Sequence, residues 1–187
     1  MNNVALVFPG QGSQYIGMTK DIPESTNIKK IINKLSDIFG VDVLSFCHNG
    51  PKEQLNSTYI AQPAILVHSL ILDYILKLNK IKVNAVAGHS LGEYSALVSS
   101  GVISFDDCIK ILKVRCSEMQ KANEKHKGSM LAVLDNNFKL INEICQSLTN
   151  TVIANINSEN QIIISGPTDQ IEKSIILFKQ NNIKPRS

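Results

Sequence analysis

Residues 86–97 read Val-Ala-Gly-His-Ser-Leu-Gly-Glu-Tyr-Ser-Ala-Leu, and the predicted fold is built outward from them. A short run of β-branched and small residues enters a Gly-x-Ser-x-Gly turn, and a helix-forming run leaves it. Strand, tight turn and helix in this order are typical of a nucleophile elbow, which exposes a serine hydroxyl. An isolated Gly-x-Ser-x-Gly is common in ordinary turns, but this context favours Ser90 as a nucleophile. The amide of Leu91, at the start of the helix, would face an oxyanion formed there.

The bulk composition is that of an ordinary folded protein. The 187 residues are 43% hydrophobic and 19% charged, with a formal net charge of +3, which argues against a disordered or fibrous chain. Without a dense Lys/Arg run, this charge does not predict a nucleic-acid partner, although a weak attraction to an anionic substrate or acidic partner stays open. The four cysteines lack Cys-x-x-Cys spacing, so we expect no metal site and small buried thiols in a reducing compartment.

Neither a secretory leader nor a membrane anchor is predicted. The N-terminus enters a strand almost at once and lacks a charged and then apolar leader. The longest apolar run, residues 64–78, is interrupted by His68, Asp73 and Lys77, and we expect it to be too short to span a bilayer. The sequence therefore predicts a cytoplasmic protein without a membrane partner.

The first half of the chain is predicted to hold two strands among several helices. Residues 4–8 are a continuous apolar run, typical of a buried parallel strand, and a glycine-rich loop follows. That loop is either a tight connection or one whose amides face the same site as Ser90 and supply a second oxyanion donor. Helices are expected over residues 24–39 and 51–55, and from Pro63 to about Asn79. Gln62 then fits either a helix cap or an amide facing the site.

A capping box at residues 104–107 predicts the start of a long helix, and Arg115 lies among the apolar positions of this helix. The buried stripe expected on that helix is Cys108, Ile111, Leu112, Cys116 and Met119. Arg115 lies on the same stripe, where an unpaired guanidinium would cost several kcal/mol of desolvation. An ion pair with a core carboxylate would explain it. Ser90 is the other polar group that we expect to face a cavity. An arginine near a serine nucleophile would suit a substrate that carries a carboxylate, so Arg115 also fits a role in substrate binding.

From Gly128 the pattern changes to β-α-β-β-α. Strands are expected over residues 129–134, 152–157 and 161–165, and helices over 138–148 and 168–181. This is the order of a ferredoxin-like unit that lacks its last strand. We therefore divide the chain into residues 1–127, which carry the elbow, and residues 128–187. Because two parallel strands do not make a stable sheet, we expect the chain to be part of a larger fold.

Six segments support a family resemblance when they are taken together. They are residues 8–14, 62–64, 88–96, Arg115 with Met119-Gln120, 128–133, and 154–158 with 161–166. In these segments the chain resembles the malonyl-CoA:acyl-carrier-protein transacylases, the acyltransferase family of fatty-acid and polyketide synthesis. The resemblance implies an α/β fold: an α/β-hydrolase-like large subdomain, incomplete here, with an inserted ferredoxin-like subdomain and the site between them.

The resemblance also implies an activity in fatty-acid biosynthesis. Malonyl would pass from the coenzyme A thioester to Ser90, and then to the phosphopantetheine thiol of acyl carrier protein. The amides of Gln11 and Leu91 would form the oxyanion hole, and Arg115 would bind the malonyl carboxylate. No bound cofactor is implied, because malonyl-CoA is a substrate and the phosphopantetheine belongs to the acceptor. Further residues that could line the site are His89, Gln62 and Met119.

The chain departs from the family pattern at two points. Glu159 stands where the family often has proline, a minor change in a surface turn. More seriously, the family's general-base histidine and the residue that orients it would lie beyond Ser187. We do not expect any of the four histidines in the chain to replace it. His89 should point away from the Ser90 hydroxyl, and His68 fits a core histidine whose hydrogen bonds are satisfied. His48 and His126 should face solvent.

Two alternative functions therefore stay open at this point. The first is a catalytically incomplete, truncated form that binds the carrier protein or a complementing C-terminal segment. The second, which Arg115 disfavours, is a serine thioesterase or hydrolase. The sequence does not decide between malonyl and methylmalonyl as the acyl group.

Overall fold

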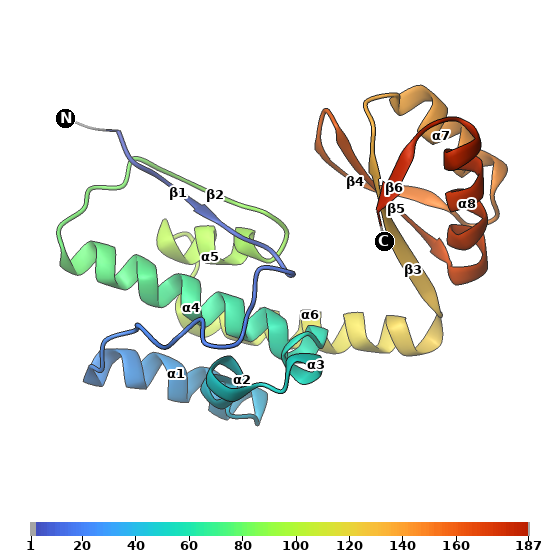
Figure 1. Cartoon of the computed structure of the whole chain (residues 1–187). Helices are drawn as coiled ribbons and strands as arrows, with labels where there is room; N and C mark the ends of the chain where they lie inside the picture. The colour runs from blue at the N-terminus through green and yellow to red at the C-terminus, as the bar shows by residue number, and fades with distance from the viewer. Residues whose placement is uncertain (1–2, 187) are drawn as a thin grey trace. The chain divides into compact units, whose positions relative to one another are not determined.

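The computed structural model describes residues 3–186 (Figure 1). The chain divides into two compact units, Met1–Gln120 (unit 1) and Lys121–Ser187 (unit 2). Unit 1 contains a parallel pair of strands with helices, and unit 2 contains an antiparallel four-stranded sheet with helices. The α/β fold class predicted from the sequence is therefore confirmed.

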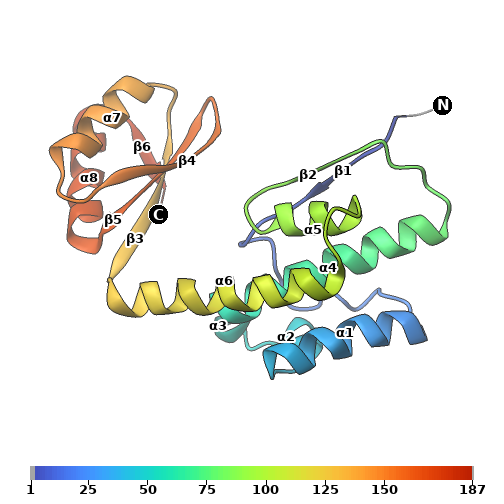
Figure 2. The same ribbon diagram turned by 180° about the vertical axis from the view of Figure 1, so that it is seen from behind.

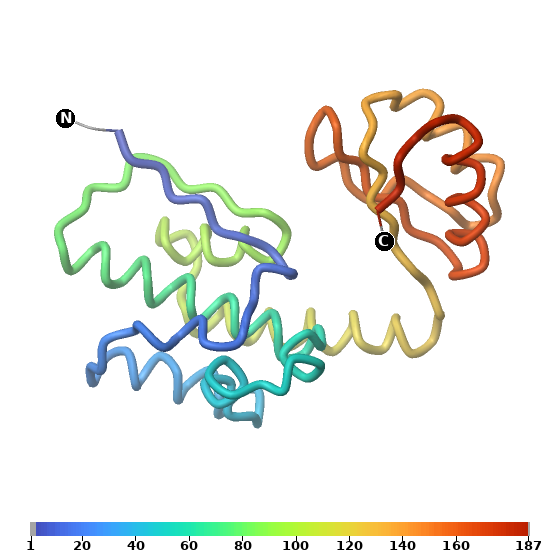
Figure 3. Tube along the Cα trace, viewed as in Figure 1, coloured from blue at the N-terminus to red at the C-terminus, as the bar shows by residue number. Residues whose placement is uncertain are grey.

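Unit 1 is built on two strands that lie far apart in the sequence. β1 (Ala5–Phe8) and β2 (Ala85–Gly88) are parallel, and Phe8 lies opposite Gly88. The strands are connected by α1 (Thr26–Phe39), α2 (Val43–Asn49), α3 (Lys52–Leu55) and α4 (Thr58–Leu78), and they are followed by α5 (Gly92–Ser99) and α6 (Phe105–Lys125). Figure 3 traces this path of the chain from blue to red. The sequence predicts both strands and every one of these helices except α2.

α4 is the central helix of unit 1. α5 packs against both strands, α4 packs against α5, and α1 and α2 pack against α4 (Figures 1 and 2). Because α4 is apolar nearly all round, it can be covered from several sides, and most of its side chains are buried. The core of unit 1 therefore forms around this helix.

The structure corrects the predicted start and length of α4. The helix begins at Thr58, so Pro63 lies inside it and not at its first position. Proline is typical of the first helical position, but Ile60 and Ala61 are buried in the core, and their packing outweighs that signal. At 21 residues, α4 is the one helix of residues 3–186 that is long and apolar enough to cross a membrane, contrary to our expectation. The apolar part of this helix is 67% buried inside the protein.

Two predicted burial patterns are also wrong. β1 does not behave as a fully buried strand: Phe8 is buried, but Val7 is 75% exposed. In residues 3–186 this sheet has only two strands, and α5 covers one face of it. On α6, Ile111 is 46% exposed and Ile109 is buried in its place, because the buried face is centred between Cys108 and Leu112.

Unit 2 has a ferredoxin-like order of elements. These are β3 (Gly128–Leu134), α7 (Phe138–Ser147), β4 (Val152–Ser158), β5 (Gln161–Pro167), α8 (Thr168–Gln180) and β6 (Lys184–Arg186). The strands are antiparallel and their order in the sheet is β4-β5-β3-β6. The two helices pack against each other and against the sheet, where they bury Leu131, Ile164 and Phe178 in a separate core.

The last strand, which we expect to be missing from the sequence, is present in short form. β6 comprises three residues and pairs with β3, so that Pro185 lies opposite Val133. A three-residue segment with a central proline carries almost no strand signal, but proline is tolerated on an edge strand. The ferredoxin-like unit therefore has all four of its strands.

The four cysteines are buried free thiols, as predicted. Burial raises the pKa of Cys47 to about 12, and the pKa values of Cys108 and Cys116 to about 11. Burial also raises the pKa of Cys145. Since the thiolate is the reactive form, a raised pKa makes a thiol less reactive below that pH.

We therefore predict that the native protein resists thiol alkylation. At about pH 8 the buried thiols stay protonated and out of reach, so labelling by iodoacetamide should be at least tenfold slower than for unfolded chain. Mass spectrometry of labelled peptides measures each site, and the same protein in concentrated guanidinium is the control. A native thiol that reacts as fast as the unfolded chain would contradict this prediction.

Candidate active site

Ser90 occupies a strained turn between β2 and α5. Its φ is 53°, in the left-handed region, and the residue is exposed. A residue with a side chain pays roughly 1–2 kcal/mol for this conformation, which persists only where the surrounding structure enforces it. β2 ends two residues before Ser90 and α5 begins two residues after it. The backbone thus has the geometry of a nucleophile elbow.

Two glycines allow the strand and helix of the elbow to cross closely. A Cβ atom on Gly88 would lie 2.1 Å from the backbone carbon of Gly92. A Cβ atom on Gly92 would lie 2.1 Å from the carbonyl oxygen of Phe8, at the end of β1. Both distances are far below van der Waals contact, so only glycine fits at either position. The Gly-x-Ser-x-Gly pattern therefore has a direct steric cause in this fold.

The loop after β1 is attached to the elbow. The amide of His89 donates to the carbonyl of Phe8 at 3.0 Å, and the amide of Gly92 donates to the carbonyl of His89 at 2.9 Å. A Cβ on Gly10 would lie 2.7 Å from the His89 carbonyl oxygen and 2.8 Å from its Nδ1. The imidazole of His89 therefore lies against Gly10, and Gln11 is the next residue in this loop.

The two amides predicted to form an oxyanion hole are available for hydrogen bonding. Within residues 3–186, neither the backbone N–H of Leu91 nor that of Gln11 donates to another group. The Leu91 side chain is fully buried, which anchors its amide at the start of α5. The side-chain amide of Gln11 donates to Thr58 Oγ1 at 3.3 Å. The Leu91 amide lies at the N-terminus of α5, where an unpaired amide favours a negative charge.

Arg115, on α6, contacts the Ser90 hydroxyl directly. Its Nη2 donates to Ser90 Oγ at 3.2 Å, and its Nη1 donates to Gln62 Oε1. The guanidinium carbon lies 5.5 Å from the centre of the Tyr94 ring. No carboxylate within residues 3–186 pairs with Arg115, so the alternative of a structural ion pair is not found there. The half-buried cation instead has neutral partners beside the serine.

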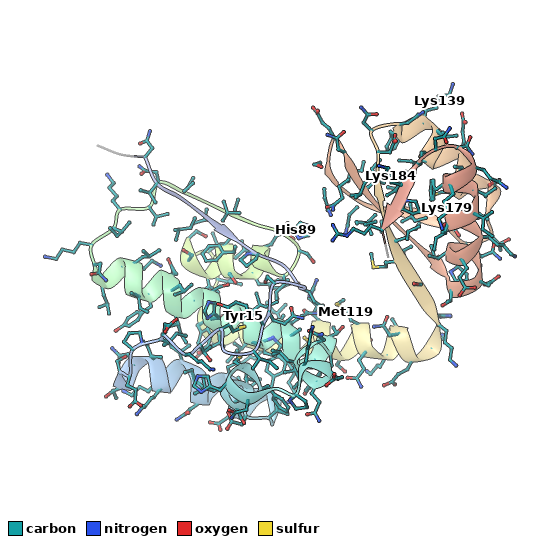
Figure 4. The ribbon with its side chains drawn as sticks, in the orientation of Figure 1. Tyr15, His89, Met119, Lys139, Lys179 and Lys184 are labelled. Atoms are coloured by element: carbon teal, nitrogen blue, oxygen red, sulfur yellow. The ribbon has the colours of Figure 1, made fainter. Side chains whose placement is uncertain are left out.

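Gln62 joins the arginine to α4. It is fully buried, and its Nε2 donates to Met119 Sδ at 3.2 Å, one helical turn beyond Arg115 on α6. Because Gln62 lies inside α4, the interpretation as a helix cap is wrong, and its amide faces Arg115. Figure 4 shows Met119 on α6 and His89 beyond the end of β2.

Tyr94 is the contact that sequence reasoning missed. It lies on α5, four residues after Ser90, and its ring contacts the Arg115 guanidinium that donates to Ser90 Oγ. Its position in the elbow motif was the available signal. A cation 5.5 Å from a tyrosine ring is a favourable cation–π contact.

The histidines do not contact the serine hydroxyl. Arg115 is the only hydrogen-bond partner of Ser90 Oγ within the described residues. His68 is half-buried and lines a cavity of about 340 Å³ beside β1 that does not include Ser90. Its Nδ1 has no hydrogen-bond partner, which corrects our expectation of a satisfied core histidine, and burial lowers its pKa.

Of the two histidines expected to face solvent, His126 does and His48 does not. His126 is exposed, whereas His48 is half-buried and its Nε2 is a buried atom without a partner. Across residues 3–186, no group of three or more His, Cys, Asp and Glu side chains could hold a metal ion.

The fold and site define an α/β protein with a serine in a nucleophile elbow. Residues 5–187 match the family model of the acyl transferase domain. The chain belongs to this family, and the resemblance drawn from the motifs is confirmed.

Curated relatives and solved structures agree with this assignment. Two proteins called malonyl CoA-acyl carrier protein transacylase, from Haemophilus influenzae and Bacillus subtilis, are 37% and 36% identical to 98% of this chain. A solved malonyl-transacylase, in complex with its type II polyketide synthase acyl-carrier protein, is 32% identical, covers 100% of this chain and superimposes with a TM-score of 0.89. The chain spans 61% and 60% of the two curated relatives, and 63% of that structure.

We predict that Gly92→Ala destabilises unit 1 strongly. The new Cβ would collide with the Phe8 carbonyl, which is backbone and cannot rotate away, so the loss should be about 3 kcal/mol or more. Gly101→Ala is the matched control. Its φ is also unfavourable, at 77°, but its Cβ would meet nothing within 4 Å, so its cost should be about 1–2 kcal/mol. Urea unfolding followed by circular dichroism measures both, and equal losses would contradict the steric argument.

Proposed function

We propose that this chain carries the nucleophile and the acyl-group binding residues of a malonyl-CoA:acyl-carrier-protein transacylase of fatty-acid synthesis. One observation carries the proposal: a guanidinium without a carboxylate partner lies 3.2 Å from the hydroxyl of an elbow serine. Membership of the acyl transferase family and the names of the relatives support it.

In the first half-reaction, Ser90 Oγ would attack the thioester carbonyl of malonyl-CoA. A C–O bond forms and the carbonyl oxygen becomes an oxyanion, which the amides of Leu91 and Gln11 would stabilise. Each such donor is typically worth about 3–4 kcal/mol of barrier. Collapse of this intermediate breaks the C–S bond and releases coenzyme A as the thiol. The malonyl ester of Ser90 remains on the enzyme.

In the second half-reaction, the phosphopantetheine thiol of acyl carrier protein would attack that ester. A C–S bond forms, the C–O bond breaks, and the proton returns to Ser90. A thioester is replaced by another thioester, so no bound cofactor is needed. Water would give hydrolysis instead, and this is the reaction that a thioesterase with the same elbow would catalyse.

Arg115 favours a carboxylated acyl group over a neutral one. In a malonyl ester, one methylene separates the ester carbonyl from the carboxylate. A guanidinium that already contacts Oγ can therefore reach the carboxylate without moving far. An arginine can donate two parallel hydrogen bonds to one carboxylate, so Arg115 is suited to bind the carboxylate of a malonyl group.

The general base is the part of the mechanism that residues 3–186 do not supply. A serine hydroxyl is a weak nucleophile at neutral pH without a base, and no histidine contacts Ser90 Oγ. The contacts of Ser90 Oγ among the described residues also fit the second function, a catalytically incomplete form that binds the carrier protein or a complementing segment.

The partner proposed for unit 2 is the acidic carrier protein. Lys139, Lys179 and Lys184 are exposed on this unit (Figure 4), and the whole chain is cationic. We propose a cytoplasmic location, in keeping with the buried position of α4. Residues 1–127 would then be the N-terminal part of the large acyltransferase subdomain, and residues 128–187 the ferredoxin-like subdomain.

The first test is formation of an acyl-enzyme. Because no base contacts Ser90 Oγ among the described residues, we expect slow transfer: prolonged incubation with malonyl-CoA should add one malonyl group to the chain, recorded by intact mass, and peptide mapping should place it on Ser90. Ser90→Ala should remove the adduct. Release of malonate without a carrier would favour a hydrolase, and no adduct together with carrier binding would favour the non-catalytic form.

The second test concerns the acyl group and needs binding alone. Arg115→Ala should weaken malonyl-CoA binding by roughly tenfold to a hundredfold, the range for a hydrogen-bonded charge pair. Acetyl-CoA lacks the carboxylate, so its affinity should stay within about twofold. Titration calorimetry with both thioesters measures this, and equal losses for both would contradict a role in binding the carboxylate.

A further inference from the structure

Gln62 gives the Arg115 guanidinium a hydrogen-bond acceptor but no negative charge. Its carbonyl oxygen accepts from Arg115 Nη1, and its NH₂ group donates to Met119 Sδ at 3.2 Å. The amide is fully buried inside α4, so its orientation is fixed by these two contacts. A thioether accepts a hydrogen bond but cannot donate one, so Met119 holds the NH₂ group on its own side. The carbonyl oxygen of Gln62 must then face Arg115.

The charge of Arg115 remains uncompensated within the described residues. Among the acidic groups of unit 1, the buried Asp73 is taken by Lys77 at 2.7 Å and by Ser99 Oγ at 2.9 Å. The remaining contacts of the guanidinium, Ser90 Oγ and the Tyr94 ring, are neutral as well. A half-buried cation of this kind attracts an anion strongly.

We propose that Gln62 is a specificity-determining residue: its neutral amide, oriented by Met119, holds the Arg115 guanidinium beside Ser90 while leaving its charge for the acyl group. This inference rests on the proposed function and assigns a positioning role that acts through Arg115. A carboxylate at the same place would hold the guanidinium equally well, but it would also neutralise it. An apolar side chain would leave the charge of Arg115 intact, but it would no longer hold the guanidinium in position.

The quantity that tests this is a ratio of affinities. The dissociation constant of acetyl-CoA divided by that of malonyl-CoA reports what the carboxylate contributes, and it is independent of folding losses that affect both ligands. Titration calorimetry on the full chain measures both constants, and thermal melting by circular dichroism checks that each variant is folded.

Gln62→Glu and Gln62→Met separate charge from geometry. We expect Gln62→Glu to lower the ratio by roughly tenfold or more, toward one, because the new carboxylate occupies the arginine. Gln62→Met should lower it by a smaller factor, about threefold, because the charge remains but Nη1 loses its acceptor. Gln54→Glu is the matched control: Gln54 is exposed on α3, so the same charge change there should leave the ratio within about twofold.

Met119→Leu keeps the test decisive if a Gln62 variant does not fold. The exchange conserves volume, removes only the sulfur acceptor, and should lower the ratio by about threefold, beyond the change allowed for the Gln54→Glu control. If the folded variants keep the wild-type ratio, the inference is overturned while the proposed function stands. If the wild type itself shows no preference for malonyl-CoA, and Arg115→Ala changes nothing, the proposed function fails and the inference falls with it.

Discussion

The close crossing of α5 over the ends of both strands is the constraint on which the site depends. Gly92 lies so near the Phe8 carbonyl, and Gly88 so near Gly92, that no side chain fits at either glycine. The chain must therefore turn sharply between them, and the left-handed conformation of Ser90 is the result. The amide of His89, in the same turn, donates to the carbonyl of Phe8, so the elbow is also bonded to the end of β1. Backbone sterics thus set the conformation of Ser90 and of the residues on either side of it.

The second determinant is a cation that the protein buries halfway without giving it a counter-charge. A surface arginine would be screened by water, and a core arginine would need a carboxylate. Arg115 has an amide oxygen, a hydroxyl and an aromatic ring instead. These contacts fix its position and leave its charge unused. Under the proposed function, an arrangement of this kind would give the site affinity for an external anion.

Local patterns in the sequence predicted the elements of the site better than their surroundings. The glycines and the serine in a strand–turn–helix context predicted the elbow. Helical periodicity showed that Arg115 lies on an apolar stripe, where a charged residue is unusual. The role of Gln62 could not be predicted, because its partners lie more than 50 residues away. The exposure of Val7 was missed for a similar reason, since a strand's own residues do not reveal how many neighbours cover it.

The proposed function separates recognition of the acyl group from proton transfer. The groups of unit 1 that would recognise a malonyl thioester are the elbow serine, the amides of Leu91 and Gln11, and the Arg115 guanidinium. None of these groups removes the serine proton, and the described histidines do not contact it. Charge recognition and oxyanion stabilisation depend on preorganised dipoles and a fixed cation, which need no titrating group. Under the proposed function, such a site would bind and orient its acyl donor before a base takes part, so affinity measurements would report on these residues even where turnover depends on other groups.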